Sequence, residues 1–269
     1  MSNYITHLSF SRLKELNHSP LALQRYLLKA RVATKAMDEG TLLDVLLFTP
    51  EKLDQTFYVM PDDVKKPTSV QLNAAKPSEA TLAQIARWQE VEAEINGRIV
   101  ITPQQKADAE FLRDAVQNNS TVVFHGLMKR DAFTFQPGIE EFYYKGFLHR
   151  GFADAMGKTR DGINCIWDLK RMGSRSGESL VRSQIRQNMY DLQAAIYCHP
   201  YDSEGIPCKY YIIAVDNEGF VTPFEISRDA RDRARFMWDR LIRAAHRCNM
   251  EGLDAGTEFW ADSQGFFNY

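Results

Sequence analysis

Apolar residues recur at helical spacing through the first 130 positions, and residues typical of helix ends stand at the borders of these stretches. Ser9 and Ser19 each cap a short predicted helix, and Pro20 suits the first helical position of the second one. Longer helices are predicted for residues 38–47, 78–96 and 103–118. Residues 61–77 hold three prolines and little apolar periodicity, which predicts a long mobile loop.

The pattern changes after Phe133, where aromatic and branched residues become dense. Three strands that form a meander are predicted at residues 140–149, 151–157 and 163–169. A long helix over 179–198, a hairpin of strands 209–215 and 220–224, and a last helix capped by Ser227 follow. We therefore expect an α/β (α+β) fold in which helices flank a mixed central sheet. One domain, 1–269, is predicted, with a helical part over about 1–130 and a sheet-containing core over about 131–269.

Composition narrows the class of protein only slightly. The chain has 269 residues, 44% of them hydrophobic, which excludes a disordered chain. Lys and Arg number 33 against 35 Asp and Glu, so the net charge of −2 gives no general argument for a nucleic-acid or membrane partner. No run of about 18 apolar residues is present, so we expect a cytoplasmic protein with no membrane span. Residues 145–186, however, hold nine basic and four acidic residues, which predicts a basic surface confined to one region.

Three charged residues of the predicted strands suggest chemistry. Asp168 and Lys170 stand two residues apart on one strand, so both side chains leave the same face, and Asp154 lies on the preceding antiparallel strand. Two neighbouring carboxylates raise each other's pKa, and a divalent cation is the usual remedy. Oxygen ligands of this kind suit Mg²⁺ or Mn²⁺. A lysine beside the metal can orient or help deprotonate a water, which are the parts of metal-assisted phosphodiester hydrolysis.

The same pair also fits an ordinary solvated surface, where an Asp–Lys contact contributes about 0–1 kcal/mol. The helix that follows favours the first interpretation, because a polar stripe runs beside its apolar stripe. The stripe consists of Arg182, Arg186, Tyr190, Gln193 and Tyr197, and Arg171 and Arg175 precede it. These side chains could bind phosphates, or the stripe could be an ordinary polar flank with amphipathic tyrosines. On the first interpretation we expect Arg171, Arg175, Arg182, Arg186 and Tyr190 to bind the phosphates of a nucleic-acid strand.

Four short segments in this order carry a family resemblance. They are Gly40 to Asp44, Gly151 to Asp154, Asp168 to Lys170 and Gln193 to Tyr197. The chain thereby resembles the RecB-type branch of the PD-(D/E)xK nucleases, where the motifs read G-x-x-x-H, G-x-x-D, D/E-x-K and Q-x-x-x-Y. Within that branch, residues 9–27, 35–40 and 99–105 look like the RecE-like (exodeoxyribonuclease VIII-like) enzymes of phages and prophages.

The resemblance implies a Mg²⁺-dependent exodeoxyribonuclease that digests linear double-stranded DNA from 5′ to 3′. Its product would be a 3′ single-stranded tail for homologous recombination in the bacterial host cell. A ring-shaped homo-oligomer (trimer or tetramer) and a single-strand annealing protein as partner are implied as well. The implied catalytic residues are Asp154, Asp168, Lys170, Gln193 and Tyr197, and the implied metal ligands are Asp44, Asp154, Asp168 and Glu141.

One position departs from the family pattern. Asp44 stands where the family has histidine, and an aspartate is at least as good a ligand for Mg²⁺. Glu141, or its neighbour Glu140, would open the first strand and supply a further acid. Two other functions stay open at this point: a non-catalytic DNA-end-binding or inhibitory protein on the same fold, and an endonuclease of the same superfamily.

Overall fold

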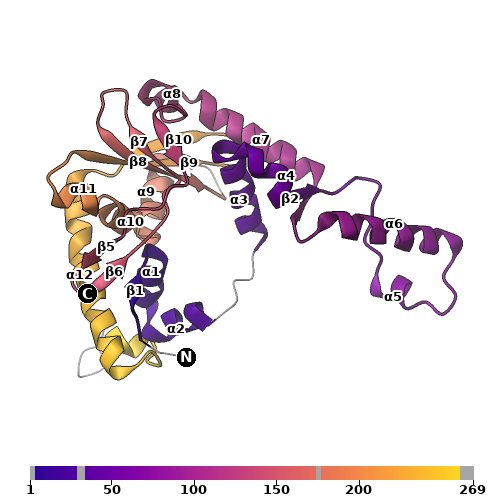
Figure 1. Ribbon diagram of the computed structural model, residues 1–269, viewed down its shortest axis with the longest axis horizontal. Helices are drawn as coiled ribbons and strands as arrows, with labels where there is room; N and C mark the ends of the chain where they lie inside the picture. Colours follow the sequence, from indigo (N-terminus) through magenta and orange to yellow (C-terminus); the bar gives the residue numbers. More distant parts are fainter. Residues whose placement is uncertain (1–3, 29–33, 174–176, 261–269) are drawn as a thin grey trace. The chain divides into compact units, whose positions relative to one another are not determined.

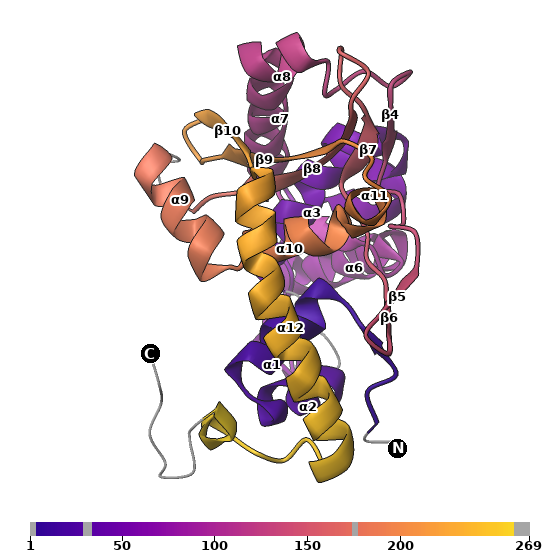
Figure 2. The same ribbon diagram turned by 90° about the vertical axis from the view of Figure 1, so that its left-hand side faces the viewer.

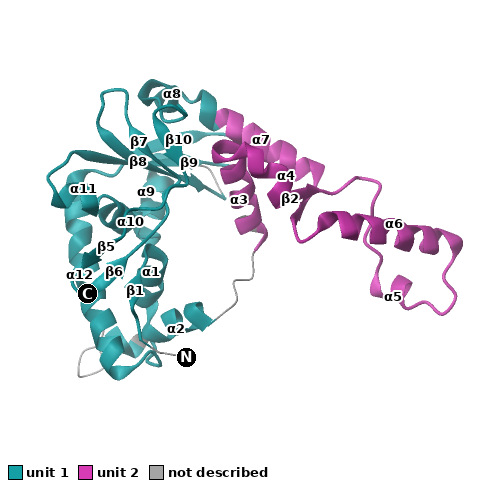
Figure 3. Ribbon diagram, viewed as in Figure 1, with its two compact units in different colours: residues 1–32, 116–269 teal, residues 33–115 magenta. Residues whose placement is uncertain are grey.

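A computed structural model describes residues 4–28, 34–173 and 177–260 (Figure 1). The chain divides into two compact units, which Figure 3 colours separately. Unit 1 comprises residues 1–32 and 116–269, and unit 2 comprises residues 33–115. Helices and mixed sheets both occur, which confirms the predicted fold class, whereas the single domain stays a prediction. No helix in the described ranges is long and apolar enough to cross a membrane.

Unit 2 combines helices of different lengths with a two-stranded sheet. Its elements are α3 (Lys35–Phe48), η1 (Pro50–Lys52), α4 (Leu53–Thr56), β2 (Phe57–Val59), α5 (Ser69–Leu72), α6 (Glu79–Ile95), β3 (Ile99–Ile101) and α7 (Pro103–Asn118), of which α7 ends in unit 1. Strands β2 and β3 pair in parallel. Leu42, Leu46, Phe57 and Ile101 form the buried core of this unit. Ser78 caps α6 by accepting from the backbone N–H of Thr81, and α6 lies within the range predicted for a helix, 78–96.

The predicted loop over 61–77 is wrong in one respect, because it contains the short helix α5. Thr68 and Gln71 form a reciprocal capping box: the Thr68 hydroxyl accepts from the Gln71 backbone, and the Gln71 side chain accepts from the Thr68 backbone. These two contacts stabilise a single helical turn. The three prolines of the segment are typical of loops, so the sequence pattern does not indicate this turn. The mobility of the segment stays a prediction.

The helices of unit 1 come from both ends of the chain. They are α1 (Phe10–His18), α2 (Pro20–Leu28), α8 (Ser120–His125), α9 (Glu178–Gln187), α10 (Tyr190–Tyr197), α11 (His199–Ser203), α12 (Arg228–Glu251) and η2 (Thr257–Trp260). Ser9 caps α1, Ser227 caps α12 and Pro20 opens α2, as predicted. Helix α12 contacts both α1 and α10, so it links the N-terminal helices to the second half of the chain (Figure 2).

A five-stranded mixed sheet is the frame of unit 1, with the order β10-β9-β8-β7-β4. Its strands are β4 (Phe133–Phe135), β7 (Ala155–Lys158), β8 (Asn164–Arg171), β9 (Cys208–Val215) and β10 (Val221–Glu225). Strands β8 and β9 are parallel and the other pairs are antiparallel. The predicted mixed sheet and the predicted β9–β10 hairpin are therefore confirmed.

The two faces of this sheet carry different residues. On one face Ile166, Tyr210 and Ile212 join the main core, which α10 and α12 supply with Leu192 and Trp238 among others (Figure 2). On the other face the Trp167 ring meets Phe135, and the Tyr211 ring meets His125 of α8. The strand β8 is thus covered on both faces, which explains its nearly continuous burial.

The predicted strand over 140–149 is wrong. This segment forms a hairpin of β5 (Phe142–Tyr144) and β6 (Phe147–His149), which joins β1 (His7–Leu8) in a separate three-stranded sheet. Lys145 and Gly146 make the turn with positive φ of 45° and 90°. Glycine tolerates such a backbone without steric cost, and two consecutive left-handed residues suit the twist of a two-residue hairpin turn.

The predicted single helix over 179–198 is also wrong, because it breaks into α9 and α10. Met189 takes a left-handed conformation with φ of 58°, and Asn188 ends α9 by bonding Gln184. Lys14 of α1 donates to the Asn188 side chain at 2.9 Å, so a residue far away in the sequence holds the break. The apolar pattern continues across the break, which hides it in the sequence.

Candidate active site

Strand β8 presents Asp168 and Lys170, the two charged residues of the predicted D-x-K motif, on one face. Asp168 is 3% exposed, and the Lys170 ammonium forms an ion pair with its Oδ2 atom. The residues between and before them, Leu169 and Trp167, face the opposite way and are buried. A buried carboxylate is thereby held at the sheet with one cation as its immediate partner.

Asp154 lies directly beside this pair. The β7–β8 ladder ends where Ala155 faces Trp167, and one further step of the same register places Asp154 opposite Asp168. The backbone N–H of Leu169 donates to Asp154 Oδ2 at 2.6 Å, which ties the half-buried carboxylate to the edge of β8. Directly opposite residues of an antiparallel pair have Cβ atoms about 5 Å apart. The two carboxylates are therefore close enough to share a cation.

The electrostatics of Lys170 reflect both acids. Burial of its ammonium opposes the charged form, but the negative charges of Asp168 and Asp154 outweigh this effect and raise the Lys170 pKa. Its Nζ atom also lies 5.0 Å from the centre of the Tyr190 ring, at a distance suited to a cation–π contact. Burial, together with Asp168, raises the pKa of the Tyr190 phenol as well. Lys170 is thus a lysinium that compensates two carboxylates.

Helix α10 brings the two residues of the predicted Q-x-x-x-Y motif to the same place. Gln193 is buried, and its Nε2 donates to Asp168 Oδ1 at 3.4 Å, so the two oxygens of Asp168 have different partners. Burial and the charge of Asp168 raise the pKa of Tyr197 to about 12. Tyr197 therefore stays a neutral phenol beside the carboxylates at any physiological pH.

Gly151 of the G-x-x-D segment packs directly against Tyr197 of the Q-x-x-x-Y segment. A Cβ atom at Gly151 would lie 2.8 Å from Cε1 and 3.0 Å from the hydroxyl of Tyr197, which is closer than real Cβ contacts come. Only a glycine lets the backbone that leads to Asp154 pass along the Tyr197 ring. This close approach gives a physical reason for the glycine of the G-x-x-D segment.

We expect Gly151→Ala to lower the free energy of unfolding by about 2 kcal/mol, because overpacking at a closed site costs about 1–3 kcal/mol. The displaced Tyr197 ring should also reduce activity. Urea unfolding measures the first effect. Gly173→Ala is the matched control, since nothing lies within 4 Å of a Cβ there. Equal stability of the two variants would contradict the close approach.

Two further residues lie near the site and are not among the residues predicted from the sequence. Lys14 of α1 is one of them: burial and the positive charge of Lys170 lower its pKa, although Glu15 opposes the shift. Tyr210 on β9 is the other, and it is fully buried on the same face as Asp168, with its ring centre 6.4 Å from that of Tyr197. No local pattern reveals either residue, because both come from elements distant in the sequence.

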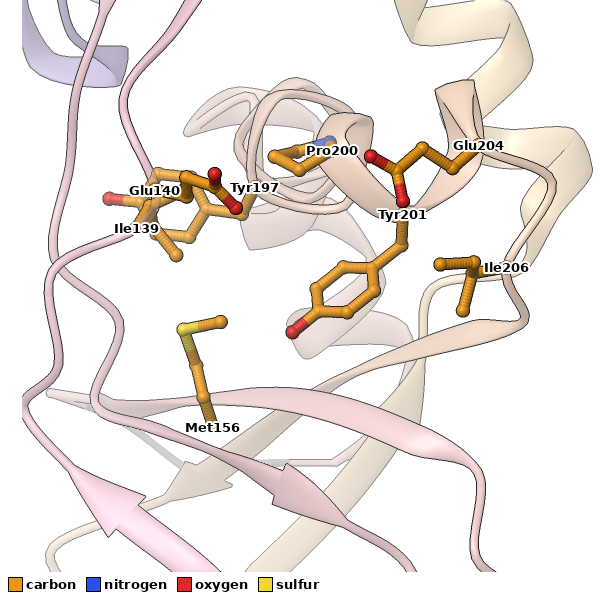
Figure 4. A pocket seen from close by; sticks show the side chains of 8 residues that line it. All are labelled: Ile139, Glu140, Met156, Tyr197, Pro200, Tyr201, Glu204 and Ile206. Carbon is orange, nitrogen blue, oxygen red and sulfur yellow. The ribbon is translucent and has the colours of Figure 1, made fainter.

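The predicted further acid has two candidates with different surroundings. Glu141 precedes β5 and forms an exposed ion pair with Arg150 at 3.3 Å. Glu140 instead lines a pocket together with Tyr197, and Figure 4 shows both on one side of it while Tyr201 reaches into the middle. Glu141 as a metal ligand stays a prediction, and Glu140 is the acid of this pair that shares a pocket with a motif residue.

The remaining predicted residues have different surroundings. Asp44 is a half-buried residue of α3 in unit 2, and its part in a metal site stays a prediction. Arg171 donates to Asn217 at 3.1 Å, and Arg175 lies outside the described residues. The predicted continuous stripe from Arg182 to Tyr197 is wrong, because the break at Met189 leaves Arg182 and Arg186 on α9 and the other members on α10. The two arginines therefore do not share a helix face with Gln193.

The donor set suits a hard divalent cation. Within the described residues no group of three His, Cys, Asp or Glu is preformed for a metal. Mg²⁺, however, is commonly held by one or two carboxylates together with waters and substrate phosphates. Asp154, which directly precedes β7, and Asp168 of β8 fit that requirement.

Comparison with known proteins shows a likeness to solved structures. No family model and no curated protein matches the sequence. A crystal structure of a "putative exonuclease" from Eubacterium rectale is similar, with a TM-score of 0.55 and 14% sequence identity over 90% of this chain and 82% of that chain. The structure of SSO0001 also matches, at a TM-score of 0.32 and 14% identity over 82% of this chain and 89% of that one, which is too low to carry an argument. The first likeness shows a shared fold, and the RecE-like branch stays a prediction.

Proposed function

We propose that the protein is a Mg²⁺-dependent nuclease that hydrolyses phosphodiester bonds of DNA. The observation that carries the proposal is the group of Asp154, Asp168 and Lys170 on adjacent strands, with Gln193 on the inner carboxylate oxygen. Two carboxylates and a lysine at neighbouring positions serve little purpose in an apolar core, where burying such charges is costly. At a phosphate, the same group has a function.

Each residue has a definite task in this proposal. Asp154 and Asp168 would hold the cation, with Asp44 and Glu141 as further proposed ligands. A bound Mg²⁺ supplies charge neutralisation and activates the attacking water. Lys170 keeps its ammonium beside Asp168, where it offsets the negative charge that builds on the phosphate. Gln193 fixes the orientation of the Asp168 carboxylate, and the neutral Tyr197 phenol donates towards the scissile strand.

The finer proposal is an exodeoxyribonuclease that degrades linear double-stranded DNA from 5′ to 3′ and leaves 3′ single-stranded tails for recombination. The order and spacing of the four motifs support it. The name of the structurally similar Eubacterium rectale protein agrees with an exonuclease. A ring-shaped homo-oligomer and an annealing protein as partner belong to the same proposal.

The purified protein should degrade a linear duplex in millimolar Mg²⁺ and leave a covalently closed circle of the same sequence intact. An exonuclease needs an end, so the closed circle separates it from an endonuclease. Gel electrophoresis of the two substrates, with EDTA as the metal-free control, measures this. If the closed circle is also degraded, the protein is an endonuclease of the same fold and not an exonuclease.

Metal binding tests the non-catalytic alternative separately. A ligand that binds only the folded state stabilises it, by about 2.7 kcal/mol at 100 times its Kd. We expect the melting temperature to rise with Mg²⁺ or Mn²⁺ and the rise to disappear in Asp168→Asn. An unchanged melting temperature together with an intact linear duplex would favour a DNA-end-binding protein without activity.

A further inference from the structure

A hollow of about 390 Å³ in unit 1 is lined by residues of α9, β10 and the start of α12, and neither Asp154 nor Asp168 lines it. Figure 2 shows where these three elements lie. Three arginines line it: Arg182, Arg186 and Arg233. Phe224 and Ile185 provide apolar lining, and Val181 and Ile185 of α9 pack against the sheet near Phe224. The hollow thus combines cationic walls with an apolar lining.

Two of the three guanidinium groups have no hydrogen-bond or ion-pair partner among the described residues. Arg182 pairs with Glu178 at 2.8 Å and lies 5.5 Å from the centre of the Phe224 ring. Arg186 and Arg233 are exposed, and neither side chain has a hydrogen bond or an ion pair within the described part of the chain.

The acidic residues of the hollow compensate these arginines incompletely. Glu225 forms an ion pair with Lys209 at 3.3 Å, so its negative charge compensates that lysine and not the arginines. Asp191 accepts from the Leu192 backbone N–H at 2.9 Å, and burial raises its pKa although Arg233 opposes the shift. The hollow therefore carries an excess of positive charge that calls for an anionic ligand.

The hollow opens on the same face of the sheet as the candidate active site. Asp168 faces Ile212, and Ile212 faces Phe224, so the three side chains form one row across β8, β9 and β10. Strands lie about 4.8 Å apart, which puts Phe224 about 10 Å from Asp168. A nucleic-acid strand rises about 3.4 Å per nucleotide, so this span corresponds to roughly three nucleotides.

We propose that this hollow is a subsite for the phosphodiester backbone of the DNA strand, about three nucleotides from the bond that is hydrolysed. Arg186 and Arg233 each contact a phosphate, for which the planar guanidinium is suited by its paired donors. Arg182, which rests on Phe224 and Glu178, flanks them. This subsite rests on the proposed nuclease function and adds Arg233 and Phe224 to the residues expected from the sequence.

The test measures binding without hydrolysis. Fluorescence anisotropy in EDTA compares a labelled duplex with a single-stranded extension on the unmodified protein, Arg186→Ala, Arg233→Ala and the double variant. We expect each single change to raise Kd by about 5- to 10-fold and to reduce the slope of log K against log salt by about 0.7–0.9, the value for one phosphate contact. Arg243→Ala, an exposed arginine of the same helix α12, is the matched control.

Several outcomes would overturn the subsite. If Arg186→Ala and Arg233→Ala have the same Kd and the same salt slope as Arg243→Ala, the subsite is wrong, even if the unmodified protein degrades DNA. A melting temperature that rises with inorganic phosphate through Arg186 and Arg233, with unchanged DNA binding, would assign the hollow to a small anion instead. Conversely, weakened DNA binding in both variants of a protein that fails to degrade DNA would support the subsite and contradict the nuclease. The two failures are thereby distinguishable.

Discussion

Replacing Lys170 by alanine will lower the rate of DNA degradation by about 100- to 1,000-fold, the usual cost of removing one preorganised stabilising group. Lys170 is the cation that the structure places on the Oδ2 atom of the buried Asp168, next to Asp154. Without it, the site keeps the carboxylates that we propose as metal ligands, but no lysinium offsets the charge at the phosphate. The initial rate of release of acid-soluble nucleotides from a linear duplex measures the loss.

The same change should affect stability in a way that depends on metal. Removing one partner of a buried ion pair costs about 3–5 kcal/mol, and here roughly 2–3 kcal/mol because a fifth of the Lys170 side chain, 22%, is exposed. A cation at Asp168 would replace the missing charge. Urea unfolding should therefore show a less stable Lys170→Ala protein in EDTA and a larger gain from Mg²⁺ than in the unmodified protein.

Lys158→Ala serves as the matched control, because Lys158 is an exposed lysine at the far end of β7, opposite Asn164. It should leave both rate and stability nearly unchanged. If Lys170→Ala degraded DNA as fast as Lys158→Ala, Lys170 would have no part in catalysis. If its stability in EDTA were unchanged, the ion pair with Asp168 would contribute nothing.

The heart of the candidate site could be predicted because it depends on local rules. Alternation along one strand puts Asp168 and Lys170 on the same face, and a short turn to the preceding strand makes that strand its antiparallel neighbour, which brings Asp154 opposite Asp168. Helix caps at Ser9 and Ser227 are equally local, since one side chain bonds a backbone group three residues ahead. Such features need no knowledge of the remaining chain.

The errors arise where distant contacts decide the local structure. The break between α9 and α10 depends on Asn188, which Lys14 of α1 holds in place, while the apolar spacing continues as in one helix. The contact of Gln193 with Asp168 likewise depends on how α10 packs on the sheet. The β5–β6 turn is different, because its signal is local: Gly146 follows Lys145 between two aromatic stretches, and this glycine favours a turn over a single strand.

The β5–β6 hairpin contains a buried histidine, His149, whose burial the sequence pattern does not predict. His149 is 0% exposed, and neither of its ring nitrogens has a hydrogen-bond partner within the described ranges. Its ring stacks on Phe142 with centres 5.3 Å apart and meets the edge of Trp238 at 5.0 Å. Burial, with a smaller contribution from His199, lowers the pKa of His149 to about 4. The folded protein therefore holds this imidazole neutral.

This burial makes the folded state sensitive to mild acid. Below an ordinary histidine pKa of about 6.5 the unfolded chain binds a proton at His149 that the folded chain refuses, so the free energy of unfolding falls with falling pH until the folded pKa is reached. Between pH 6.5 and 4 the loss amounts to about 3 kcal/mol, and above pH 7 His149 has no effect. His199, whose pKa is lowered by burial and by Arg235 against the opposing effect of Asp202, adds to the loss.

Urea unfolding at half-unit pH steps from 4 to 8 tests this expectation. Asp239 responds at lower pH: burial raises its pKa, but Lys145 and Tyr144 outweigh burial and lower it, so the stability it contributes is lost only below about pH 4. His149→Phe should flatten the curve between pH 4 and 6.5, and His18→Gln, at an exposed histidine, is the control variant. A titration of the His149 ring by NMR gives a second readout. A midpoint near 6.5 for that ring would mean that the aromatic surroundings of His149 admit water or a proton acceptor.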